Sequence, residues 1–168
     1  MYPEDRSAAT PASPTPELAL PELVSQVYDT APAAVRSRML TQLVAQVYEA
    51  APLPLRGRLL EQLLRPLGVL SLVAVANGMF AKIRFRSGWP EAQVRLEDAQ
   101  AVQPSDVMAL VDHVQQVSMD ALHGVARMVG GSPVLASSAA AAVLVSVLLK
   151  RARQRRAADT EGSDPPVV

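Results

Sequence analysis

Residues 23–62 read LVSQVYDTAPAAVRSRMLTQ over their first half and LVAQVYEAAPLPLRGRLLEQ over their second half. The two halves, 23–42 and 43–62, are identical at eleven of twenty aligned positions, so this segment is an internal duplication. Each copy has an Ala-Pro pair in its middle, and proline disfavours helical geometry at the residue before it. We therefore expect each copy to form one helix and a turn, within a mainly α-helical fold.

Apolar spacing within the duplication predicts two amphipathic helices. The first covers residues 34–50 and places apolar side chains three and four residues apart, at Val35, Met39, Leu40, Leu43, Val44 and Val47. The second follows Pro54 and repeats the pattern with Leu55, Leu59, Leu60, Leu63, Leu64 and Leu67. Because a short turn joins them, we expect an antiparallel hairpin in which each helix covers the apolar stripe of the other.

Each copy also carries an Arg-x-Arg pair near a helix start, where cations oppose the helix dipole. The pairs are Arg36 with Arg38 and Arg56 with Arg58. One interpretation is internal: Asp29 precedes Arg36 by seven residues, as Glu49 precedes Arg56, and each acid meets its arginine across the turn. The other interpretation assigns these arginines to a lipid phosphate or an acidic protein surface. We favour the internal pairs.

A second apolar run, LGVLSLVAVANGMFA, occupies residues 67–81. As a helix, this run would reach about 22 Å, which is short of a hydrocarbon core of about 30 Å. Basic residues flank it on both sides, so the positive-inside rule favours neither orientation. We expect an apolar central helix, either buried or lying at a membrane surface.

Residues 82–98 alternate apolar and polar side chains around a turn-rich segment at 87–91, which is typical of a small β-hairpin. A lone hairpin is marginally stable, so we expect its apolar face to pack on the helices. Its outer face would carry Arg84, Arg86 and Arg95, with Trp89 at the tip. This basic and aromatic combination suits an acidic partner or a membrane interface, and a solvated surface is the alternative.

A heptad pattern follows in residues 104–128 and predicts one long amphipathic helix. Pro104 and Ser105 provide a start signal, and Gly130 with Gly131 provides a stop. Alanine and glycine weaken the heptad seam, so we favour packing within the chain over a coiled coil.

The C-terminal region combines an uncharged stretch with a basic cluster. Residues 128–149 carry no charge, and the next seven residues, KRARQRR, carry five positive charges. About 20 apolar residues span a bilayer as a helix, and anionic head groups attract basic clusters. We therefore expect residues 129–156 to be a membrane-associating segment whose lipid contacts are Lys150, Arg151, Arg153, Arg155 and Arg156. The strongly apolar part, 139–149, is short, so a buried helix of a soluble domain is the alternative.

Composition bounds the remaining possibilities. The chain has 168 residues, zero net charge and no cysteine, so disulfides, thiolate metal sites and thiol catalysis are excluded and no global attraction to nucleic acid is expected. We expect a proline-rich disordered tail at 1–21, a mainly helical domain at 22–128 with its duplication at 22–66, and an acidic disordered tail at 157–168. Residues 1–21 lack the pattern of a secretion signal. The use of arginine over lysine suggests a bacterial source.

No catalytic motif is recognisable in the sequence. His113 and His123, with Asp112 and Asp120 nearby, are the one set that suggests metal binding or acid/base chemistry, and we favour the interpretation that they are polar residues on the surface. We expect no enzyme activity and no cofactor.

These features predict a non-enzymatic, membrane-associated interaction or scaffold protein on the cytoplasmic face of the bacterial inner membrane. A membrane surface is the expected partner, and a protein partner or self-association is possible. One alternative is a soluble α-helical oligomeric or ligand-binding domain that buries both apolar runs. Another is an envelope-permeabilising protein whose apolar segments enter the bilayer together.

Overall fold

The computed structural model describes residues 16–87 and 93–162, with side chains from residue 21 onward. Within these ranges the chain is mainly helical and has no strand, which confirms the predicted class. The α-helices are α1 (Pro16–Thr30), α2 (Ala33–Ala50), α3 (Leu53–Leu64), α4 (Val69–Leu72), α5 (Met79–Ser87), α6 (Leu96–Ala101), α7 (Pro104–Val117), α8 (Met119–Gly130) and α9 (Ala139–Glu161). Two short 3₁₀ turns, η1 (Ala76–Gly78) and η2 (Pro133–Leu135), complete the described elements.

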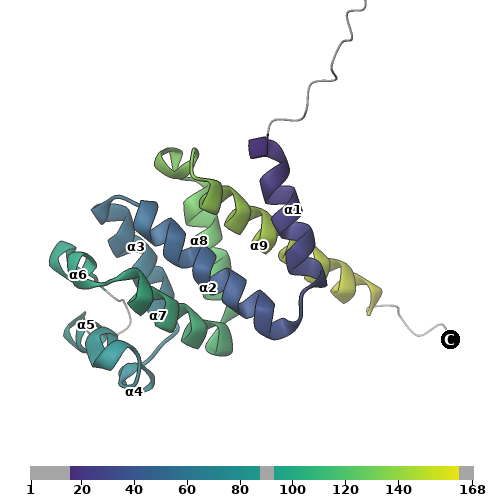
Figure 1. Cartoon of the computed structure of the whole chain (residues 1–168). Coiled ribbons are helices and arrows are strands. Elements are labelled where there is room, and N and C mark those ends of the chain that lie inside the picture. The colour runs from purple at the N-terminus through teal and green to yellow at the C-terminus, as the bar shows by residue number, and fades with distance from the viewer. Residues whose placement is uncertain (1–15, 88–92, 163–168) are drawn as a thin grey trace, which may run out of the picture.

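The helices pack around one apolar core (Figure 1). Helix α2 lies against α7 and α9, α8 packs between α9 and α3, and α1 lies along α9. Helices α4, α5 and α6 gather at the end of the molecule opposite the C-terminal part of α9 (Figure 1). Large, fully buried side chains come from six of these helices, α2 to α5, α7 and α8: Tyr48, Leu60, Leu72, Phe80, Leu110 and Leu122.

Both Ala-Pro turns of the duplication interrupt the helices where the sequence predicts. Helix α1 ends at Thr30 and α2 begins at Ala33, whereas α2 ends at Ala50 and α3 begins at Leu53. We predicted that α2 and α3, which the second turn connects, pack against each other as an antiparallel hairpin. This prediction is wrong. Helix α2 packs mainly on α7 and α9, and α3 packs mainly on α6 and α8. Each stripe is therefore covered by helices from later in the chain.

The apolar run at 67–81 is not the single central helix that we expected. It divides into α4, η1 and the start of α5. Ala76, Asn77 and Gly78 all have positive φ, at 49°, 57° and 78°. Asparagine and glycine tolerate this left-handed geometry, so a tight turn replaces the continuous helix. The run is only partly buried, because Leu70 is 90% exposed.

The β-hairpin predicted over residues 82–98 is also wrong. Its first arm is helix α5, and its second arm is an extended segment leading into α6. In α5 the buried residues Phe80 and Ile83 follow helical spacing, whereas Phe85 is 78% exposed. An alternation over five residues is too short to distinguish the two-residue repeat of a strand from the 3.6-residue repeat of a helix, and the burial of Phe80 favours the helix. Residues 88–92 lie outside the described residues.

The heptad segment is two helices rather than one. Ser118 has extended geometry, with φ −155° and ψ 108°, and separates α7 from α8. This break directs α8 toward α3 and α9, where Leu122 and Val125 are buried. A Cβ built on Gly124 would lie 2.0 Å from Nε2 of Gln62, so this glycine leaves room for the flexible side chain of Gln62 on α3.

The C-terminal apolar run lies in the core. Helix α9 buries Ala141, Val143, Leu144, Val147 and Leu148, and the helix continues through the basic cluster to Glu161. Residues 16–21 and 157–161, which we expected within disordered tails, are therefore helical. Among the helices of the described ranges, none has both the length and the apolar character needed to cross a membrane.

Candidate functional site: the basic half of α9

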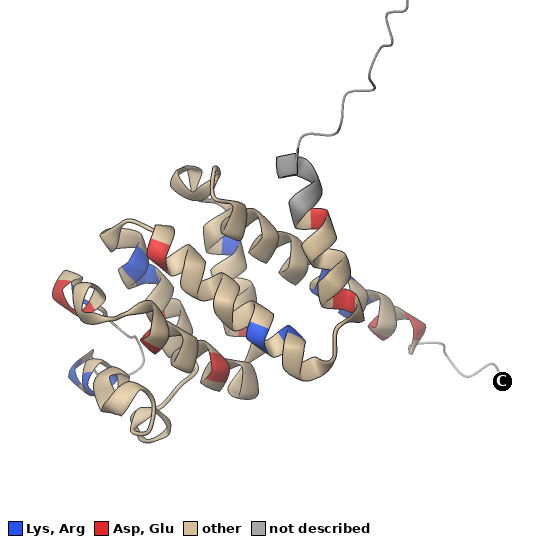
Figure 2. Ribbon diagram, in the orientation of Figure 1, with Lys and Arg blue, Asp and Glu red and all other residues tan. Residues whose placement is uncertain are grey.

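The five predicted lipid-binding residues, Lys150, Arg151, Arg153, Arg155 and Arg156, share one continuous helix, and we call them the basic half of α9. They follow directly after the buried apolar half of the same helix. Arg153, Arg155 and Arg156 are exposed, whereas Arg151 is partly buried. Figure 2 shows basic residues on this part of α9 and, at the other end of the molecule, on α5.

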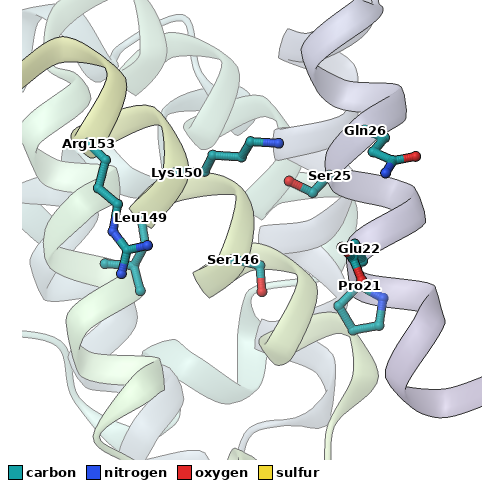
Figure 3. A pocket seen from close by; sticks show the side chains of 8 residues that line it. All are labelled: Pro21, Glu22, Ser25, Gln26, Ser146, Leu149, Lys150 and Arg153. Carbon is teal, nitrogen blue, oxygen red and sulfur yellow. The ribbon is translucent and has the colours of Figure 1, made fainter. Parts of the chain in front are cut away.

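Two members of the basic half hold α1 in place. Lys150 forms an ion pair with Asp29, and Nη1 of Arg151 donates a hydrogen bond of 2.9 Å to the hydroxyl of Tyr28. A cleft of about 570 Å³ lies between α1 and α9 beside these contacts, and Lys150 extends toward α1 in Figure 3. The other residues lining this cleft are mostly polar, including Glu22, Ser25, Gln26 and Ser146. Lys150 and Arg151 therefore have structural partners.

A smaller hollow of about 280 Å³ lies where α2, α7 and α9 meet. Arg36 and Arg151 line it together with Asp112. Its wall is ordered by Gln115, whose Nε2 donates to Oγ1 of Thr41 at 2.9 Å. The carboxylate of Asp112 offsets part of the positive charge, so this hollow is less suited to an anion than a purely basic site.

A third hollow, of about 700 Å³, lies between α8 and the basic half of α9, and we call it the α8–α9 groove. Its basic residues come from both helices: Arg127 from α8, and Arg153, Arg155 and Arg156 from α9. Its apolar residues are Ala126, Val145, Leu148, Leu149 and Ala152. Asp120, His123 and Gly130 complete the lining. The groove thus combines a basic rim with an apolar floor.

His123 lies within this groove under a positive field. Its side chain is 14% exposed, Nδ1 lies 4.0 Å from Oδ1 of Asp120, and Nε2 is buried without a hydrogen-bonding partner among the described residues. Burial is the main cause that lowers the pKa of His123. The positive charges of Arg155, Arg151 and Arg127 lower it further, against the opposing effect of Asp120. Burial disfavours a charge on this ring, and only the smaller contributions of the three arginines reflect the positive field of the groove.

The predicted partner-binding residues of the basic hairpin do not share one outer face. Arg84 is 2% exposed, and its Nε donates to the carbonyl of Leu67 at 3.2 Å. Arg86 is exposed and forms an ion pair with Asp98. Arg95 is exposed at the start of α6, and Trp89 lies outside the described residues. Burial of Arg84 corrects its placement on the surface, while partner binding by the others stays a prediction.

One arginine of the duplication, Arg56, contacts backbone carbonyls and a ring rather than the predicted carboxylate. Nε of Arg56 donates to the carbonyl of Ala51 at 2.8 Å, and Nη2 donates to the carbonyl of Glu49 at 2.7 Å. Arg56 therefore binds the C-terminal carbonyls of α2, with its guanidinium 5.2 Å from the centroid of the Tyr48 ring. Asp29 is paired with Lys150, not Arg36.

The contribution of α8 to the groove escaped the sequence analysis. His123 and Arg127 are four residues apart and therefore lie on one helical face, which is a signal that the sequence contains. Their meeting with α9 depends on the break at Ser118, which the heptad pattern hid. Among the described residues, His, Asp and Glu side chains form no group of three that could hold a metal ion.

The chain matches no protein family, no curated protein and no solved structure. By its fold it is a mainly helical protein. Its most distinctive described surface feature is the α8–α9 groove, where two helices bring four arginines around apolar side chains.

Proposed function

We propose that this chain is a non-enzymatic helical interaction protein that attaches peripherally to an anionic membrane surface. The observation that carries the proposal is the set of four arginines, Arg127, Arg153, Arg155 and Arg156, around one groove. The attached face is the open side of the α8–α9 groove. The cytoplasmic face of a bacterial inner membrane is the surface that this charge would suit.

The physical basis is electrostatic attraction without insertion. A basic residue near an anionic lipid surface contributes about 1 kcal/mol, and screening by salt weakens that contribution. The apolar half of α9 is part of the protein core, since Leu144 and Leu148 are fully buried. Attachment by charge alone is therefore expected to be reversible and sensitive to ionic strength.

A soluble ligand-binding domain is the second candidate. Burial of the apolar half of α9 favours it over the envelope-permeabilising alternative, because a permeabilising helix would first have to leave the core. The groove volume of about 700 Å³ also lies within the usual range of small-molecule sites, about 300–1,000 Å³.

Vesicle binding with charge-matched variants tests the proposal. The test variant is R153Q/R155Q/R156Q, which keeps the ion pair of Lys150 with Asp29 and the hydrogen bond of Arg151 to Tyr28, although Arg153 also lines the cleft between α1 and α9. The matched control is R38Q/R58Q/R65Q, which removes three exposed arginines outside the groove. At low salt we expect the test variant to lose about 100-fold in affinity for vesicles with acidic lipids, from three charges at about 1 kcal/mol each.

The control variant should bind acidic vesicles nearly as well as the unaltered protein. Neutral phosphatidylcholine vesicles should bind neither variant appreciably. Equal losses in the two variants would show that only net charge matters, and retained binding by the test variant would overturn the proposal.

A further inference from the structure

The apolar floor of the α8–α9 groove has no role in attachment by charge alone. Leu149 is 47% exposed, and Ala152 and Val145 are partly buried beside it. These side chains line the same groove as the arginines, and Leu149 and Arg153 also line the cleft between α1 and α9. A ligand that contacts both must therefore join a negative charge to an apolar body.

The shape of the groove supports one small occupant. Gly130 is part of the lining, and a Cβ built there would lie 3.7 and 3.8 Å from the methyl carbons of Val145. A larger side chain at this position would narrow the space between α8 and α9. The volume of about 700 Å³ lies within the usual range of small-molecule sites, about 300–1,000 Å³.

His123 adds a second polar group next to the arginines. Its Nε2 is buried and has no hydrogen-bonding partner among the described residues, although the ring belongs to the groove lining. Buried polar atoms in folded proteins are usually satisfied, so this nitrogen is a candidate contact for a polar ligand group.

We infer that the α8–α9 groove binds one anionic single-chain amphiphile, with its head group among Arg127, Arg153, Arg155 and Arg156 and its alkyl chain over Leu149 and Ala152. The inference rests on the proposed function, because both use the same arginines. It goes further in assigning a defined site for one molecule, drawn either from a bilayer or from solution.

Calorimetric titration of the full chain with three probes tests this inference. Dodecyl phosphate below its critical micelle concentration supplies both chemical parts, inorganic phosphate supplies only the charge, and dodecyl maltoside supplies only the chain. We expect dodecyl phosphate to bind with one-to-one stoichiometry and at least about tenfold more tightly than either of the others. Equal affinity for dodecyl phosphate and inorganic phosphate would overturn the inference.

Two alanine substitutions on α9 locate the chain-binding surface. Ala152→Phe fills the groove floor and should weaken dodecyl phosphate binding about tenfold or more, while acidic vesicles still bind because every arginine remains. Ala142→Phe is the matched control, since Ala142 is exposed on the same helix and outside the groove lining. Equal losses in the two variants would place the amphiphile elsewhere.

A third test uses the unaltered protein and therefore does not depend on whether a variant folds. The ring signals of His123 in an NMR spectrum should shift with saturating dodecyl phosphate, and those of His113 on α7 should stay in place. A stationary His123 signal would overturn the inference. Vesicle binding without dodecyl phosphate binding would reject the amphiphile site alone, whereas loss of vesicle binding in the R38Q/R58Q/R65Q control as well would reject the proposed function.

Discussion

The two copies of the duplication are identical at eleven of twenty positions and occupy different surroundings. Val47 in the second copy is fully buried, whereas its counterpart Val27 is 55% exposed. Tyr48 is buried and its hydroxyl donates to the carbonyl of Ala99 at 2.8 Å. Its counterpart Tyr28 is also buried, but its hydroxyl accepts a hydrogen bond from Arg151. Both copies thus contribute to the core, but the second buries its helix more completely, and the first is also held to α9 by polar contacts.

This difference follows from the neighbours of each helix. The second copy lies on α2 and α3, which later helices cover from several sides, whereas α1 of the first copy packs mainly on α9. The two copies therefore share the same spacing of apolar residues, yet those residues are buried to different extents. Burial is the larger contributor to stability, so the two copies should respond differently to matched substitutions.

The largest contrast is expected from Val47→Asp and Val27→Asp. A carboxylate at position 47 would be buried without a partner, so we expect a loss of about 3–5 kcal/mol in the free energy of unfolding. At position 27 the carboxylate would meet solvent, and the change should stay within about 0.5 kcal/mol. Urea unfolding monitored by circular dichroism measures both. Comparable losses would show that the two copies are equivalent after all.

A smaller contrast is expected from removal of the two tyrosine hydroxyls. Tyr48→Phe leaves the buried carbonyl of Ala99 without its donor and should cost about 1–3 kcal/mol. Tyr28→Phe removes an acceptor from Arg151, a partly buried guanidinium that water can still reach, so we expect less than about 1 kcal/mol. Denaturant unfolding measures the pair, and the reverse ranking would contradict our assignment of the core.

The ion pair between Asp29 and Lys150 should matter less for global stability. Both side chains are partly exposed, so Asp29→Asn is expected to cost below about 1 kcal/mol, and Glu49→Gln, at the matching exposed position, close to nothing. The local effect should be clearer, because backbone amides of α1 should exchange faster with deuterium in Asp29→Asn while those of α2 stay protected. Unchanged exchange in α1 would mean that this pair does not fasten the first copy.

The smallest expected effect is a pH dependence that arises at His123 in the α8–α9 groove. Because burial, followed by Arg155, lowers the pKa of His123, the unfolded chain takes up a proton at a higher pH than the folded chain does. The contribution of His123 to stability is therefore fully present above about pH 6.5 and is lost as the pH falls through and below that value. The difference in unfolding free energy between the unaltered protein and His123→Gln, measured between pH 7.5 and about 5, should follow this direction. Stabilisation of the unaltered protein on acidification would contradict it.

Local patterns predicted part of this structure well. The Ala-Pro turns end helices at the expected places because proline acts on its immediate chain neighbours. The basic cluster was also recognisable, since charge is a property of composition. The prediction of a hairpin at 82–98 was wrong because alternation over a few residues fits both a strand and a helix. The residues Phe80 and Ile83 are buried in a helix, α5.

The candidate site was only half visible in the sequence. Lys150 and Arg151 belong to the predicted cluster, yet Asp29 and Tyr28, more than a hundred residues earlier, take them as structural partners. Arg127 and His123 were absent from the predicted lipid site, although the fold brings them to Arg155 and Arg156. Contacts of this kind depend on the extended Ser118 and the direction of α8, which no local periodicity revealed.

The sequence by itself determined that the chain is mainly helical, that the duplication is divided at its prolines, and that positive charge is concentrated near residue 150. Only the tertiary structure decided that Val47 is buried and Val27 is not, that the apolar residues 139–149 enter the core, and that α8 and α9 form a basic groove. The physical reason is the range of the forces involved. Backbone preferences act between neighbours in the chain, whereas burial depends on which distant helices come together to exclude water.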